Sequence, residues 1–210
     1  MAKHGTRNTY ISSEGFPLLL AVAVATIACW QFIGFLPALV PAALLVTLYF
    51  VFRDPPRPVP AVPLGVVSPV DGEVLEVSVA ERSILGGEAR IILLSVNAFG
   101  TYTARCPVEG KVMDLATDAP DSAGGFDSRG LWVRTDEGDD MVLSFKSHRF
   151  GIAPRAFIRY GERIGQGQRC AFLRLTRIAE VQVPAVARVQ VEVGQRVAAG
   201  SDVLAKLPTH

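Results

Sequence analysis

The chain has 210 residues, half of them apolar, and its 21 basic and 20 acidic side chains leave a formal net charge of +1. This length allows a membrane anchor and one domain of ordinary size, and the near-neutral charge gives no reason to expect a nucleic-acid partner. The three cysteines, Cys29, Cys106 and Cys170, are too few and too scattered for a disulfide framework or a zinc site. We therefore expect no metal, and a domain in a reducing, cytoplasm-facing environment.

A long apolar block covers residues 17–52 and ends at the charged Arg53. The block is about twice as long as the apolar core of a signal peptide and has no small-residue cleavage site before Arg53, so we expect it to be retained. About 20 residues cross the hydrocarbon core of a bilayer, and Gly34 and two prolines interrupt the block near its middle. This pattern predicts a membrane hairpin of two short helices, over residues 17–34 and 38–52.

Basic residues flank both outer ends of the block, Lys3 and Arg7 before it and Arg53 and Arg57 after it. The positive-inside rule then places the N-terminal segment 1–16 and the domain that follows the anchor on the cytoplasmic side of the cell inner membrane. One long tilted helix is the alternative interpretation. It would put the domain on the far side of the membrane from the N-terminus.

Residues 53–65 are rich in proline and predict a stiff, extended juxtamembrane linker. Beyond it, residues 66–208 carry short β-branched runs separated by Gly, Pro and Asp, and many of these runs alternate apolar and polar side chains. No helical stripe of comparable strength is present, and residues 117–130, rich in Asp, Gly and Ser, predict a loop. We therefore predict a mainly β fold, a compact β-barrel or sandwich-hybrid domain with few helices, behind an N-terminal transmembrane helical hairpin.

Two short motifs each occur twice in the predicted domain. Residues 69–74 are echoed by residues 107–112, and residues 161–167 are echoed by residues 194–200. A strand, a tight glycine turn and a second strand are how small sandwiched barrels are built, although ordinary turn chemistry explains the same repeats. The second motif also occurs in lipoyl-type carrier domains, but no lysine here lies in the Met-Lys-Met or Asp-Lys-Ala context that such carriers need.

The segments 52–57 (Phe-Arg-Asp-Pro-Pro-Arg) and 68–74 (Ser-Pro-Val-Asp-Gly-Glu-Val) resemble the signatures of the phosphatidylserine decarboxylase family, in particular its short bacterial and archaeal branch. The similarity continues through residues 105–112 and returns at residues 161–169, 181–184 and 191–200. In this order the motifs cover most of the chain beyond the anchor. Each motif alone is weak, but the ordered set after a hydrophobic anchor is fairly specific.

The resemblance implies chemistry that depends on a covalent electron sink. In the family, the serine of a Gly-Ser pair attacks the preceding peptide carbonyl, and elimination of the resulting ester leaves a pyruvoyl group at a new N-terminus. That ketone forms a Schiff base with the substrate amine and accepts the electrons that are released as CO2 departs. An Asp and a His assist the self-cleavage, in an arrangement of nucleophile, base and orienting group.

Carried over to this chain, the family Asp is Asp71, although an Asp before a Gly is also an ordinary turn residue. The family His position holds Tyr102, and a phenol with a pKa of about 10 is not a base at neutral pH. The Gly-Ser position holds Thr176 and Arg177. With a slip of one residue, Thr176 takes the place of the Ser, but Leu175 then replaces the Gly that eases a strained turn. A threonine there could leave a 2-oxobutanoyl group, whereas an arginine cannot react in this way.

Other groups are weaker substitutes for the missing residues. His4 and His210 are terminal, and His148 is more readily interpreted as a surface or loop residue than as a base. Cys170 lies near the expected cleavage site, but a small buried cysteine is the simpler interpretation.

We therefore expect a membrane-anchored phosphatidylserine decarboxylase-like protein that does not process itself, is not catalytic and needs no cofactor. Its expected partners are membrane lipid, in particular an anionic aminophospholipid, and a membrane protein or a second copy of itself. Arg53, Arg57 and Arg105 are the candidates for contacts with lipid phosphate. Alternatively, Arg53 and Arg57 only fix the topology and Arg105 pairs with a carboxylate inside the fold. The competing hypothesis is an active decarboxylase with an atypical processing site, which would carry a pyruvoyl-type group and be split near residue 176.

Overall fold

The computed structural model describes residues 10–12, 15–81, 83, 87–98, 100–115, 130–148 and 154–209. The chain divides into two compact units, Met1–Pro56 and Arg57–His210. Most of the predicted loop at 117–130 lies outside the described residues. The first unit contains the helices and the second contains the strands.

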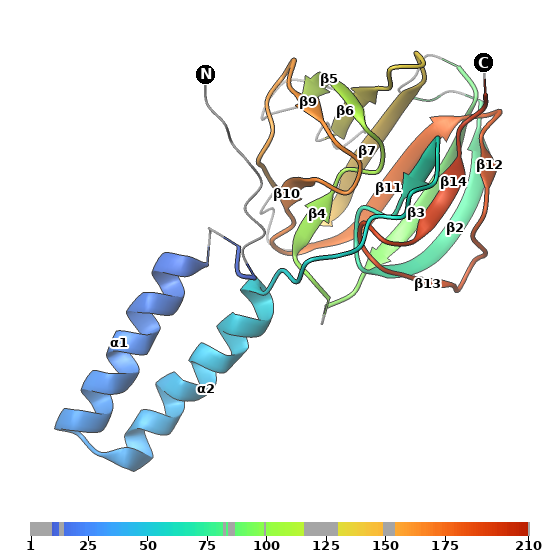
Figure 1. Cartoon of the computed structure of the whole chain (residues 1–210). Coiled ribbons are helices and arrows are strands. Elements are labelled where there is room, and N and C mark those ends of the chain that lie inside the picture. The colour runs from blue at the N-terminus through green and yellow to red at the C-terminus, as the bar shows by residue number, and fades with distance from the viewer. Residues whose placement is uncertain are drawn as a thin grey trace, which may run out of the picture. The chain divides into compact units, whose positions relative to one another are not determined.

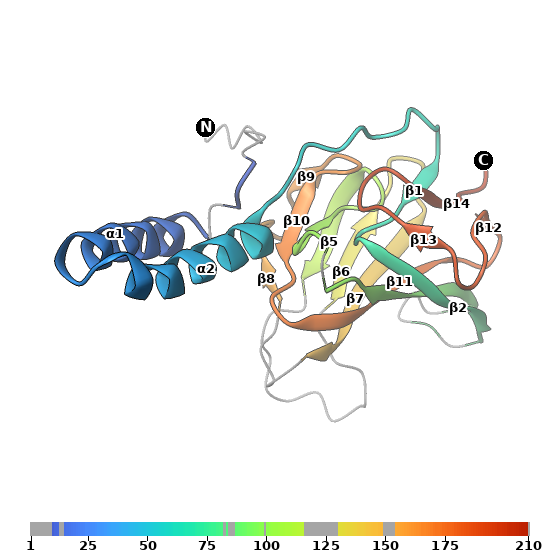
Figure 2. The same ribbon diagram turned by 90° about the horizontal axis from the view of Figure 1, so that it is seen from below.

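The helical unit is a hairpin of α1 (Phe16–Phe32) and α2 (Phe35–Phe52), which lie side by side (Figures 1 and 2). The chain reverses at Gly34, whose φ of 126° is a conformation that glycine adopts at little cost. The break therefore lies before Pro37, and α2 begins three residues earlier than the sequence pattern predicts. Proline is tolerated in the first turn of a helix, so Pro37 does not prevent this early start, and Pro41 lies inside α2.

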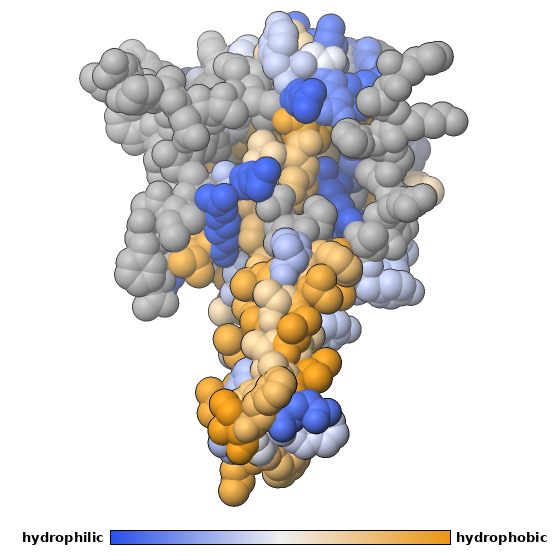
Figure 3. Space-filling model, turned by 90° about the vertical axis from the view of Figure 1, so that its left-hand side faces the viewer, coloured by the Kyte–Doolittle hydropathy of each residue, from blue (hydrophilic) through white to orange (hydrophobic). Residues whose placement is uncertain are grey.

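The surface of the helical unit is apolar on all sides. Phe32 is 88% exposed, Leu36 is 77% exposed and Val40 is 75% exposed. Figure 3 shows this hydrophobic surface in orange. A helix that is hydrophobic all round and not buried in protein is typical of a membrane segment. Within the described residues, α2 is long and apolar enough to cross a bilayer, and α1 is a slightly shorter apolar helix of 17 residues.

The second unit is built from short antiparallel strands, which confirms the predicted mainly β fold. The strands are β1 (Gly65–Val67), β2 (Gly72–Ala80), β3 (Ala89–Val96), β4 (Thr103–Arg105), β5 (Gly110–Leu115), β6 (Gly130–Arg134), β7 (Asp140–His148), β8 (Arg155–Ala156), β9 (Arg163–Ile164), β10 (Arg169–Phe172), β11 (Thr176–Pro184), β12 (Arg188–Val189), β13 (Arg196–Val197) and β14 (Val203–Lys206). One large sheet has the order β13-β2-β3-β11-β7-β6-β5-β9, and two small sheets have the orders β1-β14-β12 and β4-β10-β8. The sheets do not close into a barrel.

These sheet orders show that the domain consists of two equivalent halves. The half from β4 to β10 is continuous in sequence, and the other half combines β1–β3 with β11–β14. The large sheet reads β13-β2-β3-β11 from one edge and β9-β5-β6-β7 from the other, so β11 and β7 meet at its centre. In Figure 1, β5, β6 and β9 lie on one side of this central pair and β2, β3 and β13 on the other. The two sequence motifs that occur twice are therefore equivalent turns of the two halves.

The hydrophobic core lies against one face of the central strands. Along β11, Ala179, Val181 and Val183 are fully buried in the core, and each buried valine contributes roughly 1.5–3 kcal/mol. The side chains between them are polar. Glu180 and Gln182 are also buried, so β11 is covered on both faces.

Candidate functional site

Asp71 lies in the turn between β1 and β2 and is almost fully buried. Its Oδ2 accepts hydrogen bonds from Nη2 of Arg57 over 2.8 Å and from the amide and hydroxyl of Thr101 over 2.9 and 3.0 Å. Its Oδ1 accepts the amide of Ala199 over 2.8 Å. Three of these four hydrogen bonds converge on Oδ2, and one reaches Oδ1. Asp71 therefore holds together three segments that are far apart in the sequence.

Arg57 begins a segment that we call the proline strap, residues 57–65. Besides the ion pair of Arg57, the hydroxyl of Ser201 donates to the carbonyl of Pro58 over 3.0 Å. Val59 packs on Gly167, where an added Cβ would come within 2.4 Å of the Val59 Cγ2. These contacts fasten the first residues of the strap to the glycine turns of the domain, and the strap ends in a turn, where the amide of Gly65 donates to the carbonyl of Val62 over 3.1 Å.

Tyr102, at the position of the family His, follows the Thr101 that binds Asp71. Its hydroxyl donates to the carbonyl of Ala98 over 2.9 Å, and its own carbonyl accepts the amide of Leu173 over 2.7 Å. The ring packs against the hydrophobic core. Tyr102 is thus tied by its main chain to the turn before β11, while its phenol is bound to a carbonyl and is not among the donors to Asp71.

Thr176 and Arg177, at the position of the family Gly-Ser pair, open β11. The Thr176 amide donates to the carbonyl of Leu173 over 3.1 Å, which closes a tight turn, and Arg174 in this turn has a φ of 52°. A left-handed conformation at a residue other than glycine costs roughly 1–3 kcal/mol. Thr176 is 4% exposed, whereas the Arg177 side chain is exposed.

The register between β7 and β11 places the backbone of His148 directly opposite Thr176. Ser147, the residue before it, has a φ of 58°, so the partner strand is irregular beside the same turn. The sequence alone did not indicate this proximity, because it depends on strand pairing between segments that are far apart. The only sequence signal was that His148 is a histidine inside the domain.

The three arginines proposed for lipid contacts have different surroundings. Arg53 ends α2, and its guanidinium carbon lies 5.4 Å from the centre of the Phe50 ring, in cation–π contact. Arg105 is 6% exposed and donates from Nη1 to the carbonyl of Gly167 over 3.2 Å. Arg57 is held by Asp71. Arg57 and Arg105 therefore bind groups of the β unit, and a lipid contact of any of the three stays a prediction.

The two cysteines of the β unit are buried thiols. Burial raises the pKa of Cys106 to about 12, although a backbone hydrogen bond at Val108 opposes the shift. Burial also raises the pKa of Cys170 well above its ordinary value, with a further contribution from the nearby Cys106. Only a thiolate is a good nucleophile, so neither cysteine can replace the family serine at neutral pH. Within the described ranges, no group of three or more His, Cys, Asp or Glu side chains could hold a metal ion.

The helical unit has a cavity of its own, of about 470 Å³, between α1 and α2. Apolar side chains line it, among them Leu19, Leu20 and Ala23 of α1 and Leu45 and Val46 of α2.

Comparisons with known proteins identify the family. No protein-family model matches the chain. The phosphatidylserine decarboxylase proenzyme of Burkholderia cenocepacia strain HI2424 is 32% identical over 206 residues, which are 94% of this chain and 96% of that protein. The proenzyme of Paraburkholderia xenovorans is 31% identical over 94% of this chain and 97% of that protein. That of Cupriavidus pinatubonensis is 30% identical over 94% and 95%.

Among solved structures, glucose permease IIA from Mycoplasma capricolum has a TM-score of 0.46 and 18% identity, over 68% of this chain and 94% of that chain, which is too distant to carry a conclusion. The three relatives are all named decarboxylases of a phospholipid, and this chain covers at least 95% of the length of each. The chain belongs to the phosphatidylserine decarboxylase family.

Proposed function

We propose that this protein is a membrane-anchored member of the family that remains one uncut chain and holds an anionic aminophospholipid without decarboxylating it. The observation that carries the proposal is Arg177 at the position of the family serine. The relatives are named proenzymes, and the family resemblance implies that the catalytic group is made from that serine. A guanidinium has no oxygen with which to attack a peptide carbonyl.

The surroundings of Arg177 support the same proposal. The carboxylate of Asp71 already accepts hydrogen bonds from Arg57, Thr101 and Ala199. The phenol of Tyr102 is bound to a backbone carbonyl. Asp71 and Tyr102 are thus both held in structural contacts, and Tyr102 offers no base in place of the family His.

Anchoring in the membrane is supported by the apolar, exposed surfaces of α1 and α2. Because basic residues follow the hairpin and precede it, we place the β unit on the cytoplasmic side of the inner membrane. Arg53 at the end of α2 is suited to contact lipid phosphate at the bilayer surface. The apolar cavity between α1 and α2 is suited to an acyl chain.

Lipid selectivity can be tested with the full chain in mild detergent. Short-chain phosphatidylserine and phosphatidylglycerol are titrated in separate calorimetric experiments. The two lipids carry the same net charge, but only phosphatidylserine carries the amine and carboxylate of an amino-acid head group. Tighter binding of phosphatidylserine, with no release of CO2, supports the proposal. Equal binding of both lipids would show that the protein has no site for the aminophospholipid head group.

An active decarboxylase with an atypical processing site is the second candidate, favoured by the buried Thr176 in a strained turn opposite His148. The Thr176 hydroxyl would attack the Leu175 carbonyl and convert the peptide bond to an ester. Elimination with loss of the Cα proton would free the Leu175 carboxylate, and hydrolysis of the resulting imine would release ammonia and leave a 2-oxobutanoyl group. This candidate requires that the chain be cut into two fragments. The smaller fragment would begin with a ketone, which reacts with carbonyl reagents and blocks N-terminal sequencing.

A further inference from the structure

The two halves of the β unit correspond bond by bond at the turns that lead into β2 and β5. In one half, the amide of Val67 donates to the carbonyl of Pro107 over 2.9 Å. In the other half, the amide of Arg105 donates to the carbonyl of Pro69 over 2.8 Å. Each half thus donates one hydrogen bond to the other and accepts one from it, as an internal two-fold relationship requires.

The glycine turns follow the same correspondence. The amide of Gly200 donates to the carbonyl of Ser68 over 2.7 Å, and the amide of Gly167 donates to the carbonyl of Cys106 over 2.8 Å. Both glycines have a φ of 72°. Ser68 therefore corresponds to Cys106, and Gly200 corresponds to Gly167.

Asp71 and Glu109 occupy equivalent places in these turns. Each is the third residue after the Ser68 or Cys106 position, and each precedes the glycine that begins β2 or β5. Acidic residues at both places suggest related roles. The carboxylate of Asp71 binds a guanidinium, that of Arg57, over 2.8 Å.

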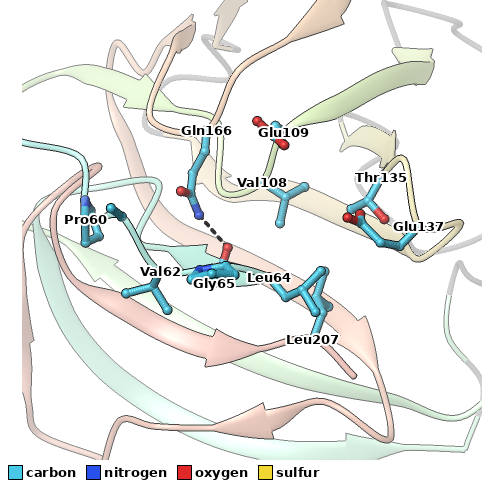
Figure 4. A pocket seen from close by; sticks show the side chains of 12 residues that line it. Pro60, Val62, Leu64, Gly65, Val108, Glu109, Thr135, Glu137, Gln166 and Leu207 are labelled. Atoms are coloured by element: carbon cyan, nitrogen blue, oxygen red, sulfur yellow. Dashed lines mark hydrogen bonds between the residues drawn. The ribbon is translucent and has the colours of Figure 1, made fainter. Parts of the chain in front are cut away.

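Glu109 differs because its side chain is exposed and forms no hydrogen bond or ion pair within the part of the chain that the structure describes. It lines a cavity of about 340 Å³ between the proline strap and the turns of the half from β4 to β10 (Figure 4). Val62, Leu64 and Leu207 line one side of the cavity, and Glu109 and Glu137 line the other. The volume lies within the range of small-molecule sites.

The negative charges of Glu109 and Glu137 have no positively charged partner in the described lining of the cavity. No lysine or arginine is among the described residues that line it. Arg163, on β9, is three residues before the lining residue Gln166, but its guanidinium pairs with Asp136. Two carboxylates above an apolar wall are complementary to a cation that is attached to a short apolar body.

We infer that this cavity binds an organic cation, a guanidinium or primary ammonium group on a short aliphatic chain, at the place in this half that corresponds to the Asp71–Arg57 pair in the other. Glu109 holds the cation, Glu137 adds charge from the turn between β6 and β7, and the apolar wall receives the aliphatic part. The site is separate from the proposed lipid function and does not depend on it.

The test uses blocked arginine, N-acetyl-arginine N-methylamide, and the corresponding blocked citrulline, which has nearly the same shape but no charge. Each is titrated by calorimetry into the full chain in mild detergent. Blocked arginine should bind roughly tenfold or more tightly than blocked citrulline, because a charge-assisted hydrogen bond is about twice as strong as a neutral one. Equal affinity for the two probes would overturn the inference.

Glu109→Gln should weaken the binding of blocked arginine by roughly tenfold or more, and Glu137→Gln should weaken it less. Glu192→Gln is the matched control, since Glu192 is also an exposed glutamate and does not line the cavity. All three side chains are exposed, so circular dichroism should show unchanged folding. Undiminished binding of blocked arginine by Glu109→Gln would contradict the assignment. Because neither probe is a lipid, this outcome would leave the separate test of phosphatidylserine selectivity unchanged.

Discussion

The guanidinium Nη2 of Arg57 lies 2.8 Å from Oδ2 of Asp71 and joins the proline strap to the turn that carries the family's acidic residue. The Arg57 side chain is 26% exposed and the Asp71 side chain 11%. An ion pair that is this well covered contributes more than a surface pair, because removal of one partner leaves the other buried without its counter-charge.

Arg57→Met, which keeps the aliphatic stem, should therefore lower the free energy of unfolding of the β unit by about 2 kcal/mol. Urea unfolding followed by the fluorescence of Trp132, in a Trp30→Phe background, measures this change. Arg57→Lys should retain part of the lost stability. An unchanged unfolding midpoint for Arg57→Met would mean that the pair does not hold the strap to the domain.

Gly200→Ala should destabilise the β unit more than Gly194→Ala, by about 1 kcal/mol or more. Both glycines have a positive φ, of 72° and 87°, so alanine is strained at both positions. At Gly200 an added Cβ would also meet the Arg105 Cδ at 2.6 Å, whereas nothing lies within 4 Å at Gly194. The comparison of unfolding free energies isolates the contact with Arg105, and equal losses would show that Arg105 moves aside freely.

The helical and β units show what a single sequence can predict. Composition and periodicity predicted an apolar hairpin and a β domain, because both depend on local pattern. The pattern named Gly34 and two prolines as interruptions, and in the structure the turn lies at Gly34, between the end of α1 at Phe32 and the start of α2 at Phe35. The partners of Asp71 and the pairing of His148 with Thr176 could not be predicted, because they arise from contacts between distant segments.

The repeated motifs are a related case. From the sequence alone, the repeated motifs were explained as well by ordinary turn residues as by a repeat within the fold. Only the sheet orders show that residues 69–74 and 107–112 occupy equivalent places in two halves of one fold. The family resemblance, in contrast, was carried by short local motifs, and the relatives confirm it.

The stability of the β unit should fall at acidic pH through Asp140. Burial raises the pKa of the Asp140 carboxyl, but hydrogen bonds from Arg134 and Trp132 outweigh this effect and hold the pKa below its ordinary value. A depressed pKa stabilises the fold above the unfolded-state pKa of about 4, and that contribution is lost as the pH falls through the folded-state value. Asp140→Asn should flatten this part of the pH profile of unfolding. A profile with the same acid slope would assign the effect to other carboxylates.

Cys106 and Cys170 should not react with a thiol reagent in the native protein at pH 8. Both are buried, and the raised pKa of Cys106, about 12, leaves almost no thiolate. Labelling should reach both cysteines only after denaturation, which mass spectrometry of peptides can show. Rapid native labelling of either cysteine would indicate that the core around β4 and β10 opens easily.

The processing residues can be returned to the family pattern by combining Tyr102→His, Thr176→Gly and Arg177→Ser. Because Asp71 and the turn before β11 are present, we expect part of the protein to be cleaved before residue 177, which gel electrophoresis and fragment mass can detect. The same variant with Asp71→Asn should remain uncut. A folded triple variant that stays intact would show that the loss of processing extends beyond these three positions.

The central claim, that the protein remains one chain, is tested most directly by the intact mass of the full protein purified from its membrane. We predict one species at the mass of the uncut polypeptide, 22.5 kDa, with no group that reacts with carbonyl reagents. Two polypeptides divided near Thr176, the smaller beginning with a ketone-bearing residue, would contradict the account and establish a self-processed enzyme.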